Sequence, residues 1–261
     1  SYTYDYDGNQ IGANYYDDFI WTEGDEIPEG CKKEVPALLS TTWGQNAPYY
    51  IATPLVDGKH CPTGCTATAL AQILNYYQYP AQYVDGPKID WANMLPGYRG
   101  EYTEAQANAV SQLMAHCGKA AHVTYDIYES TSSLEDIENG IASEFGYIVK
   151  FYGYLDWPEM KDVKKWKEII FRELSAGHPV LYGGTSYKNG YDNYFAHSFV
   201  LDGYDSKGRV HVNYGYDGDG DGYYALDNLL LKYGDRDEVF TDYQNMVVIH
   251  RPQDGSIDYD L

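Results

Sequence analysis

The sequence lacks any long apolar run among its 261 residues. A membrane-spanning helix needs about 20 consecutive apolar residues, and no segment approaches that length, so we expect no membrane span. The first residues also lack the basic and apolar stretches of a signal peptide. That lack does not indicate a cytoplasmic protein, because a chain that begins with Ser1 is expected to be a trimmed form.

Basic side chains are scarce as well. There are 18 Lys and Arg against 39 Asp and Glu, which gives a formal net charge of −21. A field of that sign repels nucleic acids and anionic membrane surfaces, so we expect neither as a partner. The acidity is typical of a soluble surface.

Cysteine is also rare, with four residues at positions 31, 61, 65 and 117. Four are too few for a disulfide scaffold in a chain of this length. Cys61 and Cys65 do not form a CxxC pair, and no Cys or His pair has zinc-finger spacing. We expect at most one disulfide, between Cys31 and Cys61, so at least one cysteine remains a free thiol.

The composition is typical of a globular protein, with 44% hydrophobic residues. Residues 1–34 are acidic, rich in Tyr and Gly and weakly patterned, which predicts an N-terminal extension or a linker remnant. A compact pattern begins near Val35. We expect one domain over residues 35–261, with a helical part over about 35–150 and a strand-rich part over about 151–261.

Hydrophobic periodicity divides the compact part into helices followed by strands. Helical spacing and end signals predict helices over residues 65–77, 103–116, 133–145 and 161–176. Short apolar runs between Gly, Asp and Asn turns predict strands near residues 179–182, 198–201, 210–213, 223–226 and 246–249. Helices first and strands later indicate an α+β fold rather than alternating βαβ units.

Cys65 occupies the first position of a predicted helix, directly after Gly64. The free N–H groups and the positive dipole end of a helix favour a thiolate there. The same N–H groups can hold a developing oxyanion. A buried, inert cysteine is the common alternative.

A thiolate nucleophile needs an imidazole, which holds the ion pair and protonates the leaving amine. His197 begins an apolar strand after a Gly- and Asn-rich loop, a place where a rigid scaffold presents a catalytic group. The other six histidines are expected to be structural or solvated. Asn213 ends a strand, where an Asn is commonly a turn residue, and its amide is also suited to orient the imidazole. The amide of Gln45 is suited to bind an oxyanion, but the residue pattern alone does not select it.

These positions fall in segments that resemble the streptopain family of secreted bacterial cysteine peptidases. Residues 61–80, CPTGCTATALAQILNYYQYP, are similar to its nucleophile helix, and residues 43–49, WGQNAPY, to its oxyanion-glutamine segment. Residues 89–96, IDWANMLP, resemble a connector of the family. Residues 196–203, AHSFVLDG, and 211–216, HVNYGY, resemble its histidine strand and Asn segment. The resemblance covers roughly residues 35–250.

The resemblance implies a papain-like fold and hydrolysis of peptide bonds, with no metal or organic cofactor. Cys65 would be the nucleophile, His197 the general base and acid, Gln45 an oxyanion donor and Asn213 the residue that orients His197. Protein or peptide substrates are implied, at a secreted or cell-surface location that is extracellular or periplasmic. Family members are typically exported as zymogens with an inhibitory prodomain, for which this chain has no segment of sufficient size.

The chain departs from the family pattern near the histidine. Tyr214 and Tyr216 stand where the family usually has Trp, which shields the histidine from water. We expect both tyrosines and Ala196 to contact substrate. Residues 124–133 differ from the family's Gly- and Ser-rich substrate-side loop, and residues 188–195 form a longer loop than expected, which predicts crowded non-primed subsites or a flap.

An acidic run offers a weak metal candidate. Asp217, Asp219 and Asp221 match the start of a calcium loop, but the twelfth position is Asn228 rather than a bidentate Glu. A solvated turn is the simpler interpretation. Two alternatives to the peptidase stay open: a thiol-dependent acyl or isopeptide transferase, and a catalytically weak peptide-binding pseudoenzyme. A calcium-stabilised surface module or adhesin is a further class.

Overall fold

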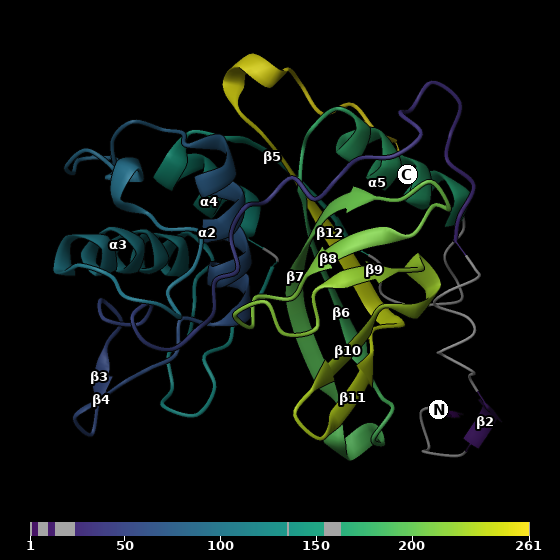
Figure 1. The fold of residues 1–261 in the computed structure, drawn as a ribbon, viewed down its shortest axis with the longest axis horizontal. Coiled ribbons are helices and arrows are strands. Elements are labelled where there is room, and N and C mark those ends of the chain that lie inside the picture. Colours follow the sequence, from purple (N-terminus) through teal and green to yellow (C-terminus); the bar gives the residue numbers. More distant parts are fainter. Residues whose placement is uncertain (1, 5–9, 14–23, 135, 154–162, 261) are drawn as a thin grey trace.

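The computed structural model describes residues 2–4, 10–13, 24–134, 136–153 and 163–260, and it has two halves that lie side by side (Figure 1). One half is helical and holds α2 (Cys65–Tyr77), α3 (Glu104–Ala120) and α4 (Ile137–Phe145). The other half is built on an antiparallel sheet. Among the described residues, no helix has the length and apolar character needed to cross a membrane.

The main sheet has six strands in the order β5-β12-β6-β7-β8-β9, and every neighbouring pair is antiparallel. The strands are β5 (Ile148–Gly153), β12 (Asp242–His250), β6 (Val180–Ser186), β7 (Phe195–Tyr204), β8 (Val210–Asn213) and β9 (Gly222–Tyr224). Within the described residues, three two-stranded sheets accompany it: β1 (Tyr2–Tyr4) with β2 (Gln10–Ala13), β3 (Leu55–Val56) with β4 (Lys59–His60), and β10 (Leu230–Tyr233) with β11 (Arg236–Val239). Short 3-10 helices span Trp91–Asn93, Tyr191–Asn193, Leu226–Asn228 and Pro252–Asp254.

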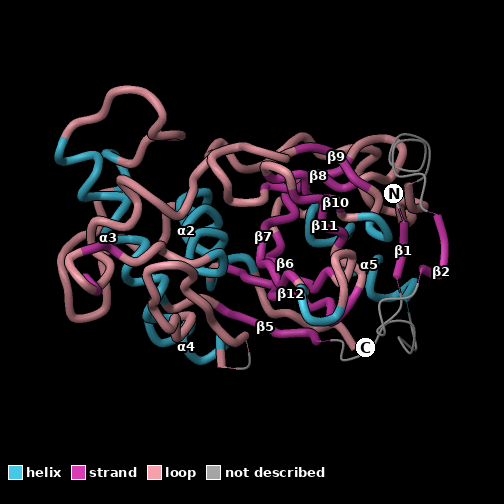
Figure 2. Tube along the Cα trace, turned by 90° about the horizontal axis from the view of Figure 1, so that it is seen from below, coloured by secondary structure: helices cyan, strands magenta, loops and turns pink. Residues whose placement is uncertain are grey.

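The sheet is covered on both faces. Figure 2 shows α2 between α3 and β7, and both views place α3 beyond α2 from the sheet, whereas α4 lies next to β5 in Figure 2. Leu181 of β6 and Val200 of β7 pack into the same core as α2. Their neighbours Tyr182 and Phe199 point the other way, into the core that also receives α5 (Val163–Ser175). Side chains alternate between the two faces because a strand has a period of two.

Helix α2 is buried almost all round, which its composition allows. Its alanines at positions 67, 69 and 71 let neighbouring elements approach closely, and all three are at most 1% exposed. The helix ends at Tyr77 and is capped by Gln78, which adopts the left-handed conformation and donates its N–H to Leu74 O. This central position carries the first residue of the helix, Cys65, to the junction of the two halves.

The α+β prediction is confirmed, and so is the order of helices and strands, with shifted ends. Helix α3 continues to Ala120, and α4 begins only at Ile137. The sequence did not lead us to expect β5 or the β10–β11 hairpin. The boundaries of an extension over residues 1–34 and of the two halves stay predictions, although Asp25 already forms an ion pair of 2.7 Å with Lys167 of α5.

The expected disulfide between Cys31 and Cys61 is wrong, because all four cysteines are free thiols. Cys31 packs against the core of the sheet half. Cys61 is buried in the loop that leads into α2, and its carbonyl accepts a hydrogen bond from Thr53. The two thiols therefore belong to different halves of the molecule.

Candidate active site

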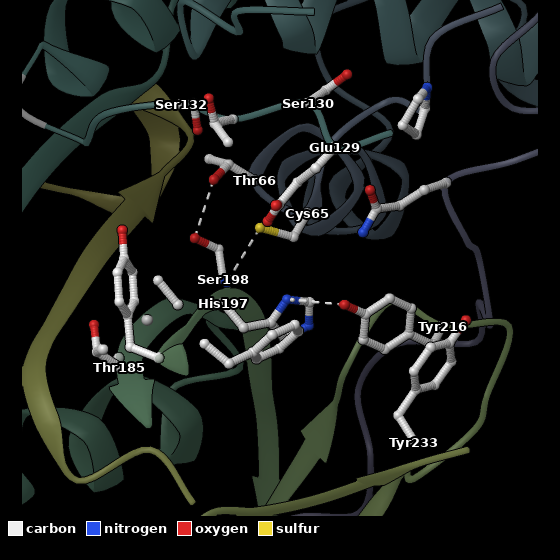
Figure 3. A pocket seen from close by; sticks show the side chains of 18 of the residues that line it. Cys65, Thr66, Glu129, Ser130, Ser132, Thr185, His197, Ser198, Tyr216 and Tyr233 are labelled. Carbon is white, nitrogen blue, oxygen red and sulfur yellow. Dashed lines mark hydrogen bonds between the residues drawn. The ribbon is translucent and has the colours of Figure 1, made fainter. Parts of the chain in front are cut away.

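A cavity of about 880 Å³ lies between the two halves, with Cys65 on one wall and His197 on the other (Figure 3). The helical wall also contributes Gln45 and the loop of residues 127–132. The sheet wall contributes residues 193–198, together with side chains from β10, β11 and β12. The site thus forms only where the two halves meet.

Gly64 positions Cys65 at the start of α2. Its φ of 87° lies in the left-handed region, which a side chain disfavours. A Cβ at this residue would also lie 3.2 Å from the carbonyl oxygen of Ser130. Glycine therefore permits the sharp entry that leaves the first N–H groups of the helix without intrahelical acceptors.

The surroundings of Cys65 favour its thiolate. Burial alone raises the pKa of the thiol, but the hydrogen bond and charge of His197 outweigh it, with help from Ser198 and Thr66. The backbone N–H of Ser198 donates to Sγ at 3.4 Å. Together they lower the pKa of Cys65 to about 7. Burial instead raises the pKa of Cys117 well above the usual range of a thiol.

His197 is held from behind by the backbone. Its Nε2–H donates to the carbonyl oxygen of Tyr214 at 2.7 Å, and this bond leaves Nδ1 for the thiol side of the ring. The ring of Tyr216 stacks on the imidazole at 4.8 Å with an interplanar angle of 5°. Its hydroxyl lies 3.5 Å from Nδ1 (Figure 3). Tyr233 stacks in turn on Tyr216 at 4.3 Å, so two aromatic layers cover the imidazole.

Asn213 does not take the place that we expected beside the imidazole. Its Oδ1 accepts from Gln72 and from the N–H of Gly215, each at 3.1 Å. Its Nδ2 donates to Thr41 O at 2.8 Å. The acceptor for His197 is instead the carbonyl of the next residue, Tyr214, so Asn213 acts on the backbone segment that carries this carbonyl.

Sequence reasoning missed Gln72, which joins three parts of the site. Its Oε1 accepts from the hydroxyl of Thr41 at 2.8 Å and from the N–H of Trp43 at 3.2 Å. Its amide is also paired with Asn213. Gln72 is fully buried two helical turns after Cys65, so a polar residue on an apolar helix was the available signal.

The other predicted residues divide between cavity and core. Gln45, Ala196 and Tyr216 all line the cavity. The side chain of Tyr214 lies instead in the core of the sheet half, fully buried, with its hydroxyl donating to Leu230 O at 2.8 Å. Its part in the site is its carbonyl, and the expectation that its side chain contacts substrate is not met.

Both unusual loops reach the cavity. Ile127 to Ser132 line one side, and Asn193 to Phe195 line the other. Of the acidic run, Asp221 accepts the N–H of Tyr214 at 2.8 Å and Asp219 pairs with Arg99 at 3.1 Å. Asp221 thus holds the backbone of Tyr214, and calcium binding stays the less favoured interpretation of this run.

Comparisons with known proteins identify the family of the chain. The family model of the peptidase C10 family matches residues 43–224. Streptopain of Streptococcus pyogenes is 29% identical over 282 residues, which cover 93% of this chain and 68% of the relative. The thiol protease/hemagglutinin PrtT of Porphyromonas gingivalis is 27% identical over 208 residues, 72% of this chain and 23% of that protein.

A solved structure is similar over nearly its whole length. Active interpain A cysteine protease of Prevotella intermedia superposes with a TM-score of 0.74 and 36% identity, covering 85% of this chain and 98% of that one. A prointerpain A fragment gives a TM-score of 0.70, 35% identity and coverage of 87% and 75%. With the family model spanning most of the sequence, this chain belongs to the peptidase C10 family and is a cysteine endopeptidase with a papain-like fold.

Proposed function

We propose that Cys65 is the nucleophile of this peptidase, that His197 is its general base and acid, and that Gln45 completes the oxyanion hole. The observation that carries the proposal is the pairing of Cys65 with His197 across the cavity, which lowers the pKa of the thiol to about 7 despite its burial. Cys65, the first residue of α2, and Gln45 both line this cavity.

The reaction then runs in two stages. The thiolate attacks the carbonyl carbon of the peptide bond, and the electron pair of the C=O bond moves to oxygen, where the two donors bind it. When the C=O bond re-forms, the C–N bond breaks, and His197 gives its Nδ1 proton to the leaving amine. In the second stage water gives its proton back to His197, attacks the thioester and releases the acid and the Cys65 thiolate.

Labelling with a peptidyl electrophile tests the nucleophile directly. We expect one label per chain, on Cys65, found by mass spectrometry of the digested protein. Cys65→Ala should take up no label and lose activity by about 10⁴-fold or more, with an unchanged fold. Cys31→Ala is the matched control, because it removes a half-buried thiol outside the cavity and should leave both readouts unchanged. A label on another cysteine would contradict the assignment.

The lowered pKa also fixes the direction of the pH profile. The thiolate is present above the pKa of about 7 and is lost as the pH falls through it. We therefore expect kcat/KM to rise through an acid limb centred near pH 7. An ordinary thiol, whose pKa is 9.0, would place that limb at a pH two units higher, and such a profile would argue against the ion pair.

We propose further that the enzyme acts outside the cell that makes it, after loss of an inhibitory prodomain. A solved relative is a fragment of prointerpain A, so a pro-form exists for that protein. The resemblance to a family of exported zymogens supports the same course here. Immunoblots of medium and cell fractions test it, and accumulation of the processed enzyme in the cytosol would contradict it.

A further inference from the structure

Three side chains with metal-binding atoms converge at the end of the sheet away from the cavity. Glu173 lies near the end of α5, His178 lies in the loop before β6, and His250 is the last residue of β12. One ligand atom of each lies within 4.8 Å of the others. Asn245 of β12 lines the cavity, and His250 lies about 16 Å farther along the strand.

The cluster is largely buried and contains one carboxylate. Glu173 is 2% exposed and His250 is 4% exposed, while the side chain of His178 is 13% exposed. One oxygen of the Glu173 carboxylate faces His250 and His178, and the other faces the hydroxyl of Tyr259.

The outer contacts of the cluster are those that orient metal ligands. The Nδ1–H of His250 donates to Gly255 O at 3.0 Å, which leaves Nε2 facing Glu173. The second oxygen of Glu173 accepts from the hydroxyl of Tyr259 at 2.7 Å. Histidines that bind metals typically donate their other N–H to a carbonyl or carboxylate, and ligating carboxylates are hydrogen-bonded in turn.

Without a metal, the cluster leaves one atom unsatisfied. Glu173 Oε1 and His250 Nε2 lie 2.6 Å apart and share a proton. His178 Nδ1 lies 3.5 Å from the same oxygen, is buried, and makes no hydrogen bond within the described residues. A simple ion pair between Glu173 and His250 accounts for their 2.6 Å contact, but it gives no role to His178 Nδ1.

We propose that Glu173, His178 and His250 bind one Zn²⁺ ion, which replaces the proton shared by Glu173 and His250. Two imidazoles and one carboxylate are a donor set that suits zinc. Zinc–ligand bonds of about 2.0–2.2 Å place neighbouring tetrahedral ligand atoms about 3.3–3.6 Å apart, a range that includes the 3.5 Å between Glu173 Oε1 and His178 Nδ1. The contact between Glu173 and His250 widens accordingly, and water completes the shell beside the partly exposed His178.

Such an ion would clamp the last segment of the chain to the sheet half. Gly255 and Tyr259 contact two of the ligands from the C-terminal tail, and the ligands themselves come from α5, the following loop and β12. None of the three ligands lines the cavity. The inferred role is structural, and it does not depend on the roles proposed for Cys65, His197 and Gln45.

Zinc titration tests the site. The Cys65→Ala variant, which cannot bind zinc through its nucleophile, is stripped with a chelator, dialysed and titrated with ZnCl₂ against a competing chromophoric chelator. We expect one Zn²⁺ per chain. His178→Gln should weaken binding by roughly 100-fold, and Tyr259→Phe, which removes only an outer contact, by about tenfold.

A matched histidine separates this site from general surface binding. His116→Gln on α3, a partly buried histidine outside the cluster, should bind Zn²⁺ as the parent does. His178→Gln should fold normally in the absence of metal, because Nδ1 has no hydrogen bond to lose among the described residues, and its melting temperature should no longer rise with ZnCl₂. Equal affinity of His178→Gln and the parent, or a parent that takes up no Zn²⁺, would overturn the proposal.

Discussion

The two walls of the cavity present their reactive groups in different ways. On the helical wall, Cys65 depends on backbone geometry, since the positive φ of Gly64 delivers it to the first turn of α2. On the sheet wall, His197 depends on its surroundings, since the Tyr214 carbonyl binds one nitrogen and the ring of Tyr216 covers one face. The placement of Cys65 therefore depends on a backbone turn, whereas the placement of His197 depends on packing and on the exclusion of water.

Gln72 connects the two walls. It belongs to α2, yet its amide binds the loop before Gln45 through Thr41 and Trp43, and it binds the end of β8 through Asn213. Thr41, Trp43 and Asn213 are all buried. If Gln72 were removed, water could therefore not replace the hydrogen bonds that they make with it. We therefore expect substitutions on the helical wall, at Gln72 and on the sheet wall to impair the enzyme in three different ways.

The largest effect in this series should come from the helical wall. Gln45→Ala removes a proposed oxyanion donor without changing the backbone, and loss of one such donor costs about 10²–10³ in kcat. KM for a peptide substrate should change little. Asn46→Ala, the next residue and also on the cavity wall, is the control that should retain activity. A higher KM with an unchanged kcat would assign Gln45 to substrate binding instead.

Removing the hydrogen bonds of Gln72 should lower kcat less than Gln45→Ala does, and it should also lower the stability of the protein. Gln72→Leu fills about the same volume but removes the acceptor of the Thr41 hydroxyl and the Trp43 N–H, which costs about 1–3 kcal/mol for each group that cannot find a new partner. We expect a lower urea midpoint and about tenfold lower kcat. Thr53→Val, a buried threonine in the loop before α2, tests whether lost stability alone lowers kcat. Wild-type kcat in Gln72→Leu would remove the proposed link between the walls.

The smallest effect should come from changing Tyr216, whose ring covers the imidazole of His197 on the sheet wall. Tyr216→Phe keeps the stacked ring and removes a hydroxyl that lies 3.5 Å from His197, so activity should stay within about threefold. Tyr216→Ala removes the ring and admits water to the imidazole, which weakens its ion pair with Cys65. The acid limb of the pH profile should then move above 7 in Tyr216→Ala only. An equal shift in both variants would assign the effect to the hydroxyl.

Much of the site was predictable because its reactive side chains have local sequence signals. Cys65 follows a glycine at a helix start, and His197 begins an apolar strand. The carbonyl of Tyr214 has no such signal, because every residue offers the same group, and Asn213 was the natural side-chain candidate beside it. Gln72 did carry a signal, a polar residue on an apolar helix, but its partners lie in segments distant in sequence.

The missed strands have a similar explanation. Lys150 interrupts the apolar pattern of β5, and Lys232 and Arg236 flank the turn of the β10–β11 hairpin. Both elements lie at edges of the sheet half, where one side of a strand is solvated and the alternation is weak. The expected disulfide was wrong because the sequence alone does not show which half Cys31 and Cys61 each join.

The alternation of β7 has a consequence for the fidelity of folding. Val200 points toward α2, while His197 shares the parity of Phe199 and Leu201, on the side of the second core. A slip of one residue in the pairing of β6 and β7 would send Ser198 to the place of His197 and would also exchange the two cores. A molecule with the shifted register would be both poorly packed and inactive. The packing that favours the correct fold therefore also favours the active enzyme.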